Sequence, residues 1–202
     1  MEAGPGISDR LLKQIEFIGK IDALKRVYRQ TYINDGSRHD NSAEHSWHLA
    51  VMAVILAEYA PVEVDISRVI RMALIHDIVE IDAGDVFIYD ESRAAEKKIQ
   101  ERLAAERLFG MLPPEHGSEL RSLWEEFETR NTPDAKFAAA LDRLEPLLHN
   151  FYTGGGAWRE HGVNAGNVIR INSRIGQSSP ELWAFARGLI EQCVAKGYLK
   201  ND

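Results

Sequence analysis

Apolar residues recur every three or four positions along most of the chain, the spacing that lines up one face of an α-helix. The first such stretch begins after Ser8, a residue type that caps helix N-termini, and extends to Val27 or Tyr28. No segment alternates with a period of two for long enough to indicate a sheet. The pattern predicts an all-α fold with about seven or more helices.

Two further helices are predicted in the first half of the chain. One covers residues 42–59 and is ended by Pro61. The next is capped by Asp65 and covers residues 66–81. Residues 29–41 are polar and lack periodicity, so we expect a loop there.

The second half of the chain continues the helical spacing. Charged amphipathic helices are predicted over residues 91–109 and 118–129. Residues 132–133, a threonine followed by a proline, have the pattern of a helix start, and Pro146 should kink that helix. The helices expected within residues 164–199 would pack on the preceding ones.

Composition and charge restrict the class of protein. The chain has 202 residues, 45% hydrophobic and 27% charged, which is ordinary for a globular domain, and we expect a single domain over residues 1–202. The net charge of -7 disfavours polymeric nucleic acid as a partner, because binding to its backbone requires a basic face. A small anionic substrate remains compatible, since a metal ion or arginines can create a local positive site.

The sequence also bears on the compartment. The longest apolar run, residues 49–57, is far shorter than the roughly 20 residues of a membrane span. The first residues lack a secretory pattern, and Cys193 is the single cysteine, which fits a reducing compartment. We expect a cytoplasmic protein without a membrane partner.

One predicted helix carries a group of polar residues: His76 and Asp77 are adjacent, and Glu80 follows one turn later. Each residue alone is compatible with a structural role. Together they favour metal binding, because ionised groups in an apolar helix are costly unless paired or coordinated. His45 and Asp142 would complete two imidazoles and two carboxylates around one divalent cation. This donor set suits Mn, Co, Fe, Ni, Zn or Mg, and the sequence does not choose among them.

Three other histidines offer alternatives. His48 could be a fifth ligand, although a packing or supporting role fits it better. His116 and His149 could supply a second metal, but only His116 lies between the His-Asp pair and the final aspartate. A mononuclear site is therefore favoured.

The chain resembles the HD-domain metal-dependent phosphohydrolases, and within them the 5′-deoxynucleotidases and their HD-domain-containing relatives. The resemblance covers residues 24–150, which would form the metal-binding core. The matching segments are Leu24-Lys25-Arg26-Val27, Glu44-His45-Ser46, His76-Asp77-Ile78-Val79-Glu80, Gly84-Asp85, Leu123-Trp124-Glu125-Glu126-Phe127-Glu128 and Ala135-Lys136-Phe137. The resemblance implies one divalent metal, held by His45, His76, Asp77 and Asp142. It also implies that Glu80 orients or deprotonates the attacking water.

Further residues are assigned to substrate binding by the same resemblance. Asp85 matches an acid near the nucleotide sugar, and Arg29 matches an arginine that contacts the phosphate. Arg38 is a second candidate for the phosphate. The chain departs from the family where an aromatic residue excludes a ribose 2′-hydroxyl: Gln30 stands there, and Tyr32 is the nearest aromatic downstream. The preference for deoxyribose is therefore left open.

The leading functional hypothesis is hydrolysis of (deoxy)nucleoside 5′-monophosphates by a metal-activated water. One alternative is another phosphoester, such as a nucleoside triphosphate or a cyclic nucleotide, at the same metal site. Another is a regulatory protein that binds metal or nucleotide without turnover, which would predict a missing catalytic group, whereas Glu80 is present. The resemblance also implies a homodimer.

Overall fold

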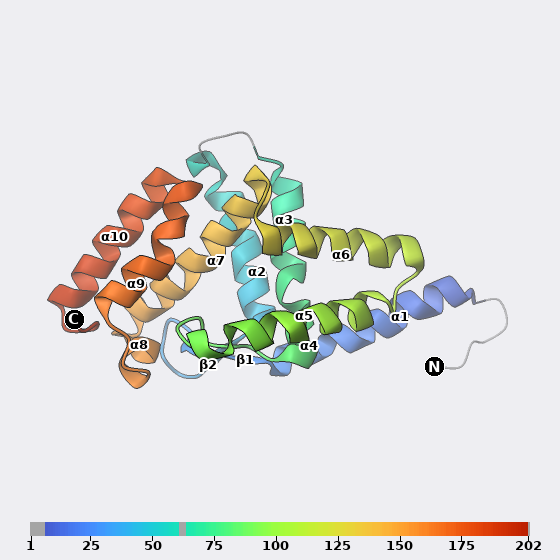
Figure 1. The fold of residues 1–202 in the computed structure, drawn as a ribbon, viewed down its shortest axis with the longest axis horizontal. Coiled ribbons are helices and arrows are strands. Elements are labelled where there is room, and N and C mark those ends of the chain that lie inside the picture. The colour runs from blue at the N-terminus through green and yellow to red at the C-terminus, as the bar shows by residue number, and fades with distance from the viewer. Residues whose placement is uncertain (1–6, 61–63, 202) are drawn as a thin grey trace.

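The structure of the chain, a computed structural model, describes residues 7–60 and 64–201. Pro61, predicted to end a helix, and the first residues, compared above with secretory signals, lie outside this range. The prediction of an all-α fold is confirmed, since helices dominate the described residues and the sheet among them has two short strands (Figure 1).

The described residues form ten α-helices and several short 3-10 helices. The α-helices are α1 (Asp9–Ile21), α2 (Ser42–Ile55), α3 (Ile66–Ile75), α4 (Glu80–Ala83), α5 (Ala94–Phe109), α6 (Pro114–Thr129), α7 (Pro133–Tyr152), α8 (Gly156–Glu160), α9 (Ala165–Asn172) and α10 (Pro180–Ala195). The 3-10 helices are η1 (Asp22–Arg26), η2 (Ala57–Tyr59), η3 (His76–Val79), η4 (Glu91–Arg93) and η5 (Ser173–Gln177).

The predicted helix starts at serine, aspartate and threonine are confirmed. The side chains of Ser8, Asp65 and Thr132 each accept a hydrogen bond from the backbone N–H three residues further on. Such bonds satisfy a donor that the first turn of a helix leaves without a partner. Local chemistry therefore determines where α1, α3 and α7 begin.

The loop expected over residues 29–41 is wrong, because the chain forms a β-hairpin there. Strand β1 (Tyr28–Tyr32) pairs antiparallel with β2 (His39–Asn41), and the rings of Tyr32 and His39 stack with centroids 4.1 Å apart. Strands of five and three residues are too short for a recognisable period of two. Packing of β1 against α7 and α8 stabilises a conformation that local sequence does not specify.

The helix predicted over residues 66–81 is interrupted near its C-terminal end, where His76 and Asp77 lie. Helix α3 ends at Ile75, and the backbone tightens into η3 before α4 begins. The Nδ1 atom of His76 lies 2.9 Å from the carbonyl oxygen of Ala73 in this region. Such 3-10 segments inside helical runs often mark functional positions.

Three other helix boundaries differ from or extend the predictions. Helix α1 ends at Ile21, where η1 begins, earlier than predicted. Helix α6 begins at Pro114, because proline lacks only an N–H that the first turn would leave unpaired. Helix α7 contains Pro146 and continues to Tyr152.

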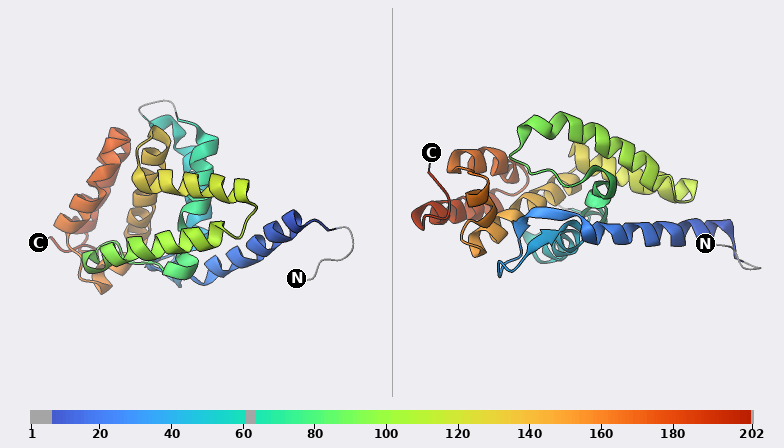
Figure 2. Two further views of the ribbon diagram at one scale, coloured as in Figure 1. Left: turned by 45° about the vertical axis from the view of Figure 1, so that its right-hand side comes forward. Right: turned by 90° about the horizontal axis from the view of Figure 1, so that it is seen from below.

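The elements that carry the polar residues pack together at the centre of the molecule. Helices α2, α3 and α7 contact one another, α5 and α6 lie on one side, and α10 packs against α7 on the other (Figure 1). Figure 2 shows α1 projecting at the end of the molecule opposite the C-terminal helices. In the described part of the chain, one buried apolar cluster extends from Phe17 to Leu199 and includes residues from most of these helices. Among the described residues, no helix has the length and apolar character of a membrane span.

Candidate metal centre and substrate cavity

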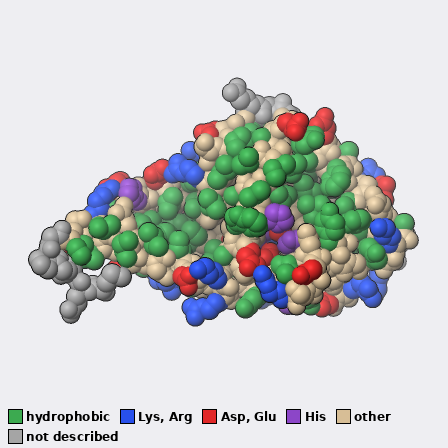
Figure 3. All heavy atoms as spheres, turned by 180° about the vertical axis from the view of Figure 1, so that it is seen from behind, with side chains coloured by type: hydrophobic (Ala, Val, Ile, Leu, Met, Phe, Trp, Pro, Cys, Tyr) green, Lys and Arg blue, Asp and Glu red, His purple; other side chains and the backbone are tan. Residues whose placement is uncertain are grey.

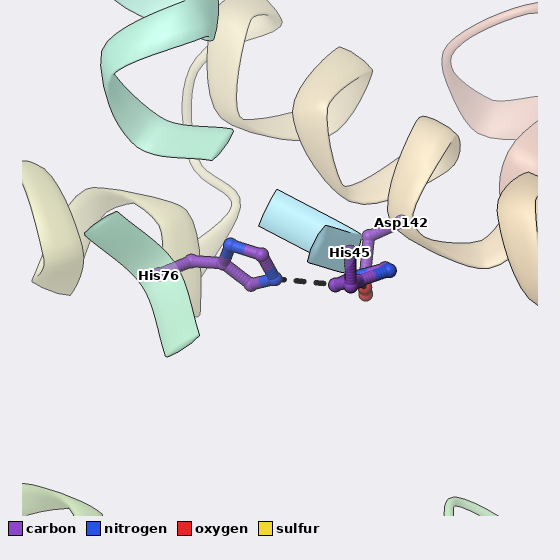
Figure 4. Close-up of side chains that lie close together, drawn as sticks. All are labelled: His45, His76 and Asp142. Carbon is purple, nitrogen blue, oxygen red and sulfur yellow. Dashed lines mark hydrogen bonds and ion pairs between the residues drawn. The ribbon is translucent and has the colours of Figure 1, made fainter. Parts of the chain in front are cut away.

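Three elements far apart in the sequence bring the four expected ligands together. His45 lies in the first turn of α2, His76 and Asp77 lie in η3, and Asp142 lies in α7. Figure 4 shows the side chains of His45, His76 and Asp142 directed toward one another. The separations are 3.1 Å for His45 Nε2 to Asp142 Oδ1, 3.0 Å for His76 Nε2 to Asp77 Oδ1, 3.7 Å for His76 Nε2 to Asp142 Oδ1 and 3.9 Å for His45 Nε2 to Asp77 Oδ2. Donors held about 2.1 Å from one shared ion lie at such distances from one another.

Each histidine directs Nε2 into this centre and holds Nδ1 against an acceptor. Nδ1 of His76 faces the carbonyl oxygen of Ala73, and Nδ1 of His45 lies 3.2 Å from Oε2 of Glu145. A proton on Nδ1 leaves the Nε2 lone pair available to a metal. Nε2 of His76 is buried without a hydrogen-bond partner. The Nε2 atoms of the two histidines, beside two carboxylates, fit a divalent cation.

Without a bound cation, protons on the imidazoles offset the charge of the neighbouring carboxylates. Burial and Arg29 lower the pKa of His45, but Glu145 and the bond to Asp142 raise it further, to about 10 overall. Burial raises the pKa of Asp142, whereas the hydrogen bond from His45 and the nearby His76 imidazole hold it well below its ordinary value. A cation would therefore displace imidazole protons and take over their contacts with the carboxylates.

Glu80 lies beside the centre and is almost completely buried. Its Oε2 atom accepts a hydrogen bond of 2.7 Å from the hydroxyl of Ser42, and its Oε1 atom is 3.5 Å from Nζ of Lys97. Burial raises the pKa of Glu80 most, and Asp77 and Asp85 add to the effect, to about 8 despite Lys97. A carboxyl group with a pKa near neutrality can take up or release a proton during a reaction.

Arg29 reaches the centre from strand β1 of the hairpin. Its Nη1 atom donates a hydrogen bond of 3.1 Å to Oδ2 of Asp77, and its side chain is 13% exposed. Burial lowers the pKa of Arg29, but Asp77, Asp85 and Glu80 raise it more, so the guanidinium stays charged. The hairpin thus places a fixed positive charge against the carboxylates.

A cavity of about 250 Å³ adjoins the centre. Its polar wall includes His76, Asp77, Glu80, Asp85 and Asp142, together with the cations Arg29, Lys97, Lys98, Arg130 and Arg143. The aromatic residues that line the cavity include Phe87, Tyr89, Phe127 and Trp158. Polar groups that converge in a concave site beside aromatic rings are typical of small-molecule sites.

The structure brings some of the expected substrate residues to this cavity and leaves others away from it. Arg29, Asp85 and also Gln30 line it. Tyr32 donates a hydrogen bond of 2.6 Å to Glu160, and Arg38 pairs with Glu44 at the surface. Neither Tyr32 nor Arg38 is among the described residues that line the cavity.

The alternative histidines also have defined places. His48 lies 3.4 Å from Glu145 and His149 lies 3.3 Å from the same oxygen, on the far side of His45 from the centre. His116 belongs to α6 and faces Arg10 and Gln14 of α1. No second metal near the centre therefore draws on His116.

A protein-family model described as "HD domain" matches residues 21–183. The chain belongs to the HD domain family. The match includes all four residues of the candidate centre, so the recognised family and the observed geometry agree.

Three relatives of this HD domain show how similar the chain is to known proteins in sequence and in fold. A crystal structure from Magnetospirillum magnetotacticum, described as a predicted metal-dependent phosphohydrolase, is 54% identical and covers 95% of this chain and 99% of that chain, with a TM-score of 0.90. Human 5′-deoxynucleotidase HDDC2 is 32% identical over 135 residues, 66% of this chain and 65% of that protein. An HD-domain phosphohydrolase from Listeria innocua, 17% identical, covers 93% of this chain and 92% of that chain, with a TM-score of 0.69, and shows the shared fold alone.

Several residues around the HD centre were not identified from the sequence. Glu145 could have been identified from its spacing, since it lies one turn after Asp142 on the same helix. Ser42, Lys97 and Arg143 have no local pattern that separates them from ordinary capping or surface residues. Their roles depend on the packing of α2, α5 and α7.

Proposed function

We propose that this HD domain is a metal-dependent phosphohydrolase that releases phosphate from nucleoside 5′-monophosphates, including deoxynucleotides. The observation that carries the proposal is the convergence of two imidazoles and two carboxylates, joined by four nitrogen–oxygen distances of 3.0 to 3.9 Å, beside the buried acid Glu80. The human relative, named a 5′-deoxynucleotidase, and the Magnetospirillum relative, described as a predicted metal-dependent phosphohydrolase, support the same reaction class.

The four residues of the centre, His45, His76, Asp77 and Asp142, would hold one divalent cation. When bound, this cation would supply Lewis-acid chemistry, because it polarises a phosphoryl oxygen and lowers the pKa of water. The donor set suits several first-row metals and does not select one.

Glu80 is the proposed acid and base of the reaction. Its carboxyl group lies next to Asp77 and is fixed by Ser42, so it can accept a proton from water at the edge of the cavity. The neighbouring Lys97 ammonium would stabilise the ionised form of Glu80 before the proton arrives.

Arg29 is the proposed phosphate-binding residue. Its guanidinium group already faces the carboxylate of Asp77 and lines the cavity, so it can offset charge on the phosphoryl group. Arg38, which pairs with Glu44 at the surface, has less support for this role.

Sugar and base would occupy the remaining cavity. Asp85 can accept hydrogen bonds from a sugar hydroxyl, and the rings of Phe87 and Trp158 offer apolar faces to a base. Gln30 lines the cavity and its Oε1 atom lies 3.1 Å from Nε2 of His161. A polar side chain here does not exclude a ribose 2′-hydroxyl as an aromatic ring would, so we expect both sugars to be accepted.

The experiment is an assay of phosphate release from ribo- and deoxyribonucleoside 5′-monophosphates, with Mn²⁺, Co²⁺ or Zn²⁺ added to metal-free protein. Nucleoside triphosphates and cyclic nucleotides belong in the same panel, with products separated by chromatography. Release from monophosphates that is lost in Asp142→Ala would support the proposal. No release from any monophosphate by the metal-loaded protein would refute it, and turnover of only triphosphates or cyclic nucleotides would establish the alternative.

We also propose that the protein is a cytoplasmic homodimer. Large apolar side chains are exposed on two helices, with Trp47 64%, Val54 58% and Ile55 64% exposed on α2 and Ile18 58% exposed on α1. Figure 3 shows hydrophobic side chains gathered over much of one face. Exposed patches of this kind commonly serve as protein interfaces.

Two matched substitutions test the dimer. Ile55→Asp would place a charge on the proposed interface, whereas Ile99→Asp would alter a similarly exposed isoleucine on α5. Light scattering after gel filtration should report a dimer for wild-type protein and Ile99→Asp and a monomer for Ile55→Asp. A monomeric wild type would refute this part of the proposal.

A further inference from the structure

A buried carboxylate lies among three imidazoles next to the metal centre. Glu145 of α7 has no exposed surface. Its Oε2 atom is 3.2 Å from Nδ1 of His45, while its Oε1 atom is 3.4 Å from Nδ1 of His48 and 3.3 Å from Nε2 of His149. One oxygen of Glu145 thus supports a ligand of the HD centre, and the other faces two histidines that are not part of that centre.

The three residues Glu145, His48 and His149, here called the Glu145 cluster, have the spacing of metal ligands. Glu145 and His149 are four residues apart on α7, so both project from one side of the helix. His48 faces them from α2. The ligand atoms of all three lie within 4.8 Å of one another. Ligands about 2.0 to 2.1 Å from a tetrahedral metal are separated by about 3.4 Å, close to the two measured distances.

Hydrogen bonds do not satisfy the cluster. Both carboxylate oxygens of Glu145 and the Nδ1 atom of His149 are buried without a partner of good hydrogen-bond geometry. Oδ2 of Asp40, which lies near His45 and Glu145, is also buried without a partner. Carboxylate oxygens at such depth are costly unless a cation or donor compensates them, and the compensating groups here are the three imidazoles 3.2 to 3.4 Å away.

The cluster is accessible to a small ion. The side chain of His48 is 34% exposed, whereas Glu145 is fully enclosed. Histidine side chains reach the surface beside the apolar area in Figure 3. An ion could therefore enter past α2 without passing through the substrate cavity.

We propose that His48, Glu145 and His149 form a second cation site, separate from the HD centre and suited to Zn²⁺ or another borderline metal such as Co²⁺ or Ni²⁺. Two imidazoles and one carboxylate, with a position left for water, are a common donor set for such ions. Oε2 of Glu145 would remain 3.2 Å from Nδ1 of His45, so one carboxylate would connect the two centres. The second site does not depend on the proposed phosphohydrolase reaction.

Metal stoichiometry tests the site directly. Protein freed of metal by a chelator is equilibrated with Zn²⁺ or Co²⁺, and bound metal is measured by elemental analysis together with the visible absorption of Co²⁺. We expect two equivalents in wild-type protein and one in His48→Ala, in His149→Ala and in His76→Ala. The two cluster variants should lose the same Co²⁺ absorption bands, and His76→Ala should lose different ones.

Controls keep the result interpretable. His116→Ala alters a histidine on α6 outside both sites and should keep two equivalents. Thermal unfolding identifies variants that fail to fold. Glu145→Gln removes the negative charge of the cluster but preserves the side-chain shape, so it repeats the test without leaving a cavity in the core.

Two outcomes would overturn the proposal. One is a single equivalent of bound metal in wild-type protein that is lost in His76→Ala and kept in His48→Ala. In that case, the cluster histidines would only support Glu145. The other is two equivalents that persist in both cluster variants. A protein that binds two equivalents as expected but hydrolyses no nucleotide would contradict the proposed function and leave the second site standing.

Discussion

The HD centre and the Glu145 cluster are built from the same donor types, and α2 and α7 contribute to both. The HD centre adds ligands from η3 and opens on a cavity that also holds Glu80, Arg29 and Lys97. The three residues of the Glu145 cluster are not among the described residues that line this cavity. Donors for a cation are therefore not enough for catalysis, which also needs an acid, a positive charge and space for substrate on one side.

The largest expected effect follows from removing a ligand that only the HD centre has. Asp77→Ala should lose the catalytic cation and reduce phosphate release by on the order of 10³-fold or more, because a bound cation contributes several kcal/mol to such reactions. Asp82→Ala, which removes a surface partner of Arg107, is the matched control and should change little. Retention of metal and activity in Asp77→Ala would show that the catalytic ion lies elsewhere.

Removing the acid while keeping the ligands should give the next largest effect. Glu80→Gln preserves shape and can still accept from Ser42, but it cannot take a proton. We expect kcat to fall by about 10² to 10⁴-fold while bound metal stays the same. Steady-state kinetics and elemental analysis on the same samples provide the check. Wild-type kcat would remove Glu80 from the mechanism.

The two hairpin arginines distinguish the cavity from the surface. Arg29→Ala should reduce kcat/KM for a monophosphate by roughly 10²-fold, because a buried donor to the phosphoryl group is lost. Arg38→Ala breaks only a surface ion pair and should have a small effect. Equal losses in both variants would place Arg38 at the substrate as well.

The smallest expected effect concerns protons at the HD centre. The pKa of His45 is raised to about 10, so His45 holds a proton at neutral pH in the metal-free protein, and the raised pKa of His76 favours its protonation too. Cation binding must displace these protons, so affinity should rise with pH by up to about tenfold per unit for each proton released. Calorimetry in buffers of different ionisation enthalpy measures the proton count. An affinity for the cation that stays constant from about pH 6 to pH 8 would contradict the raised pKa values of the two histidines.

Much of the helical architecture follows from local sequence. Ser8, Asp65 and Thr132 cap their helices as expected, since a side-chain oxygen and a nearby backbone N–H suffice for that interaction. The hairpin was missed because its strands are short and depend on contacts with α7 and α8. The break at Ile75 was missed because the apolar spacing continues through η3.

The sequence by itself determined which residues could bind a metal. The adjacent His76 and Asp77, with Glu80 one turn later, are a local pattern whose chemistry does not depend on the rest of the fold. Only the tertiary structure decided which partners meet them: it brought Arg29 rather than Arg38 to the cavity and placed Glu145 behind His45. The physical reason is that donor type is a property of one residue, whereas distance, burial and charge compensation arise when distant segments pack together.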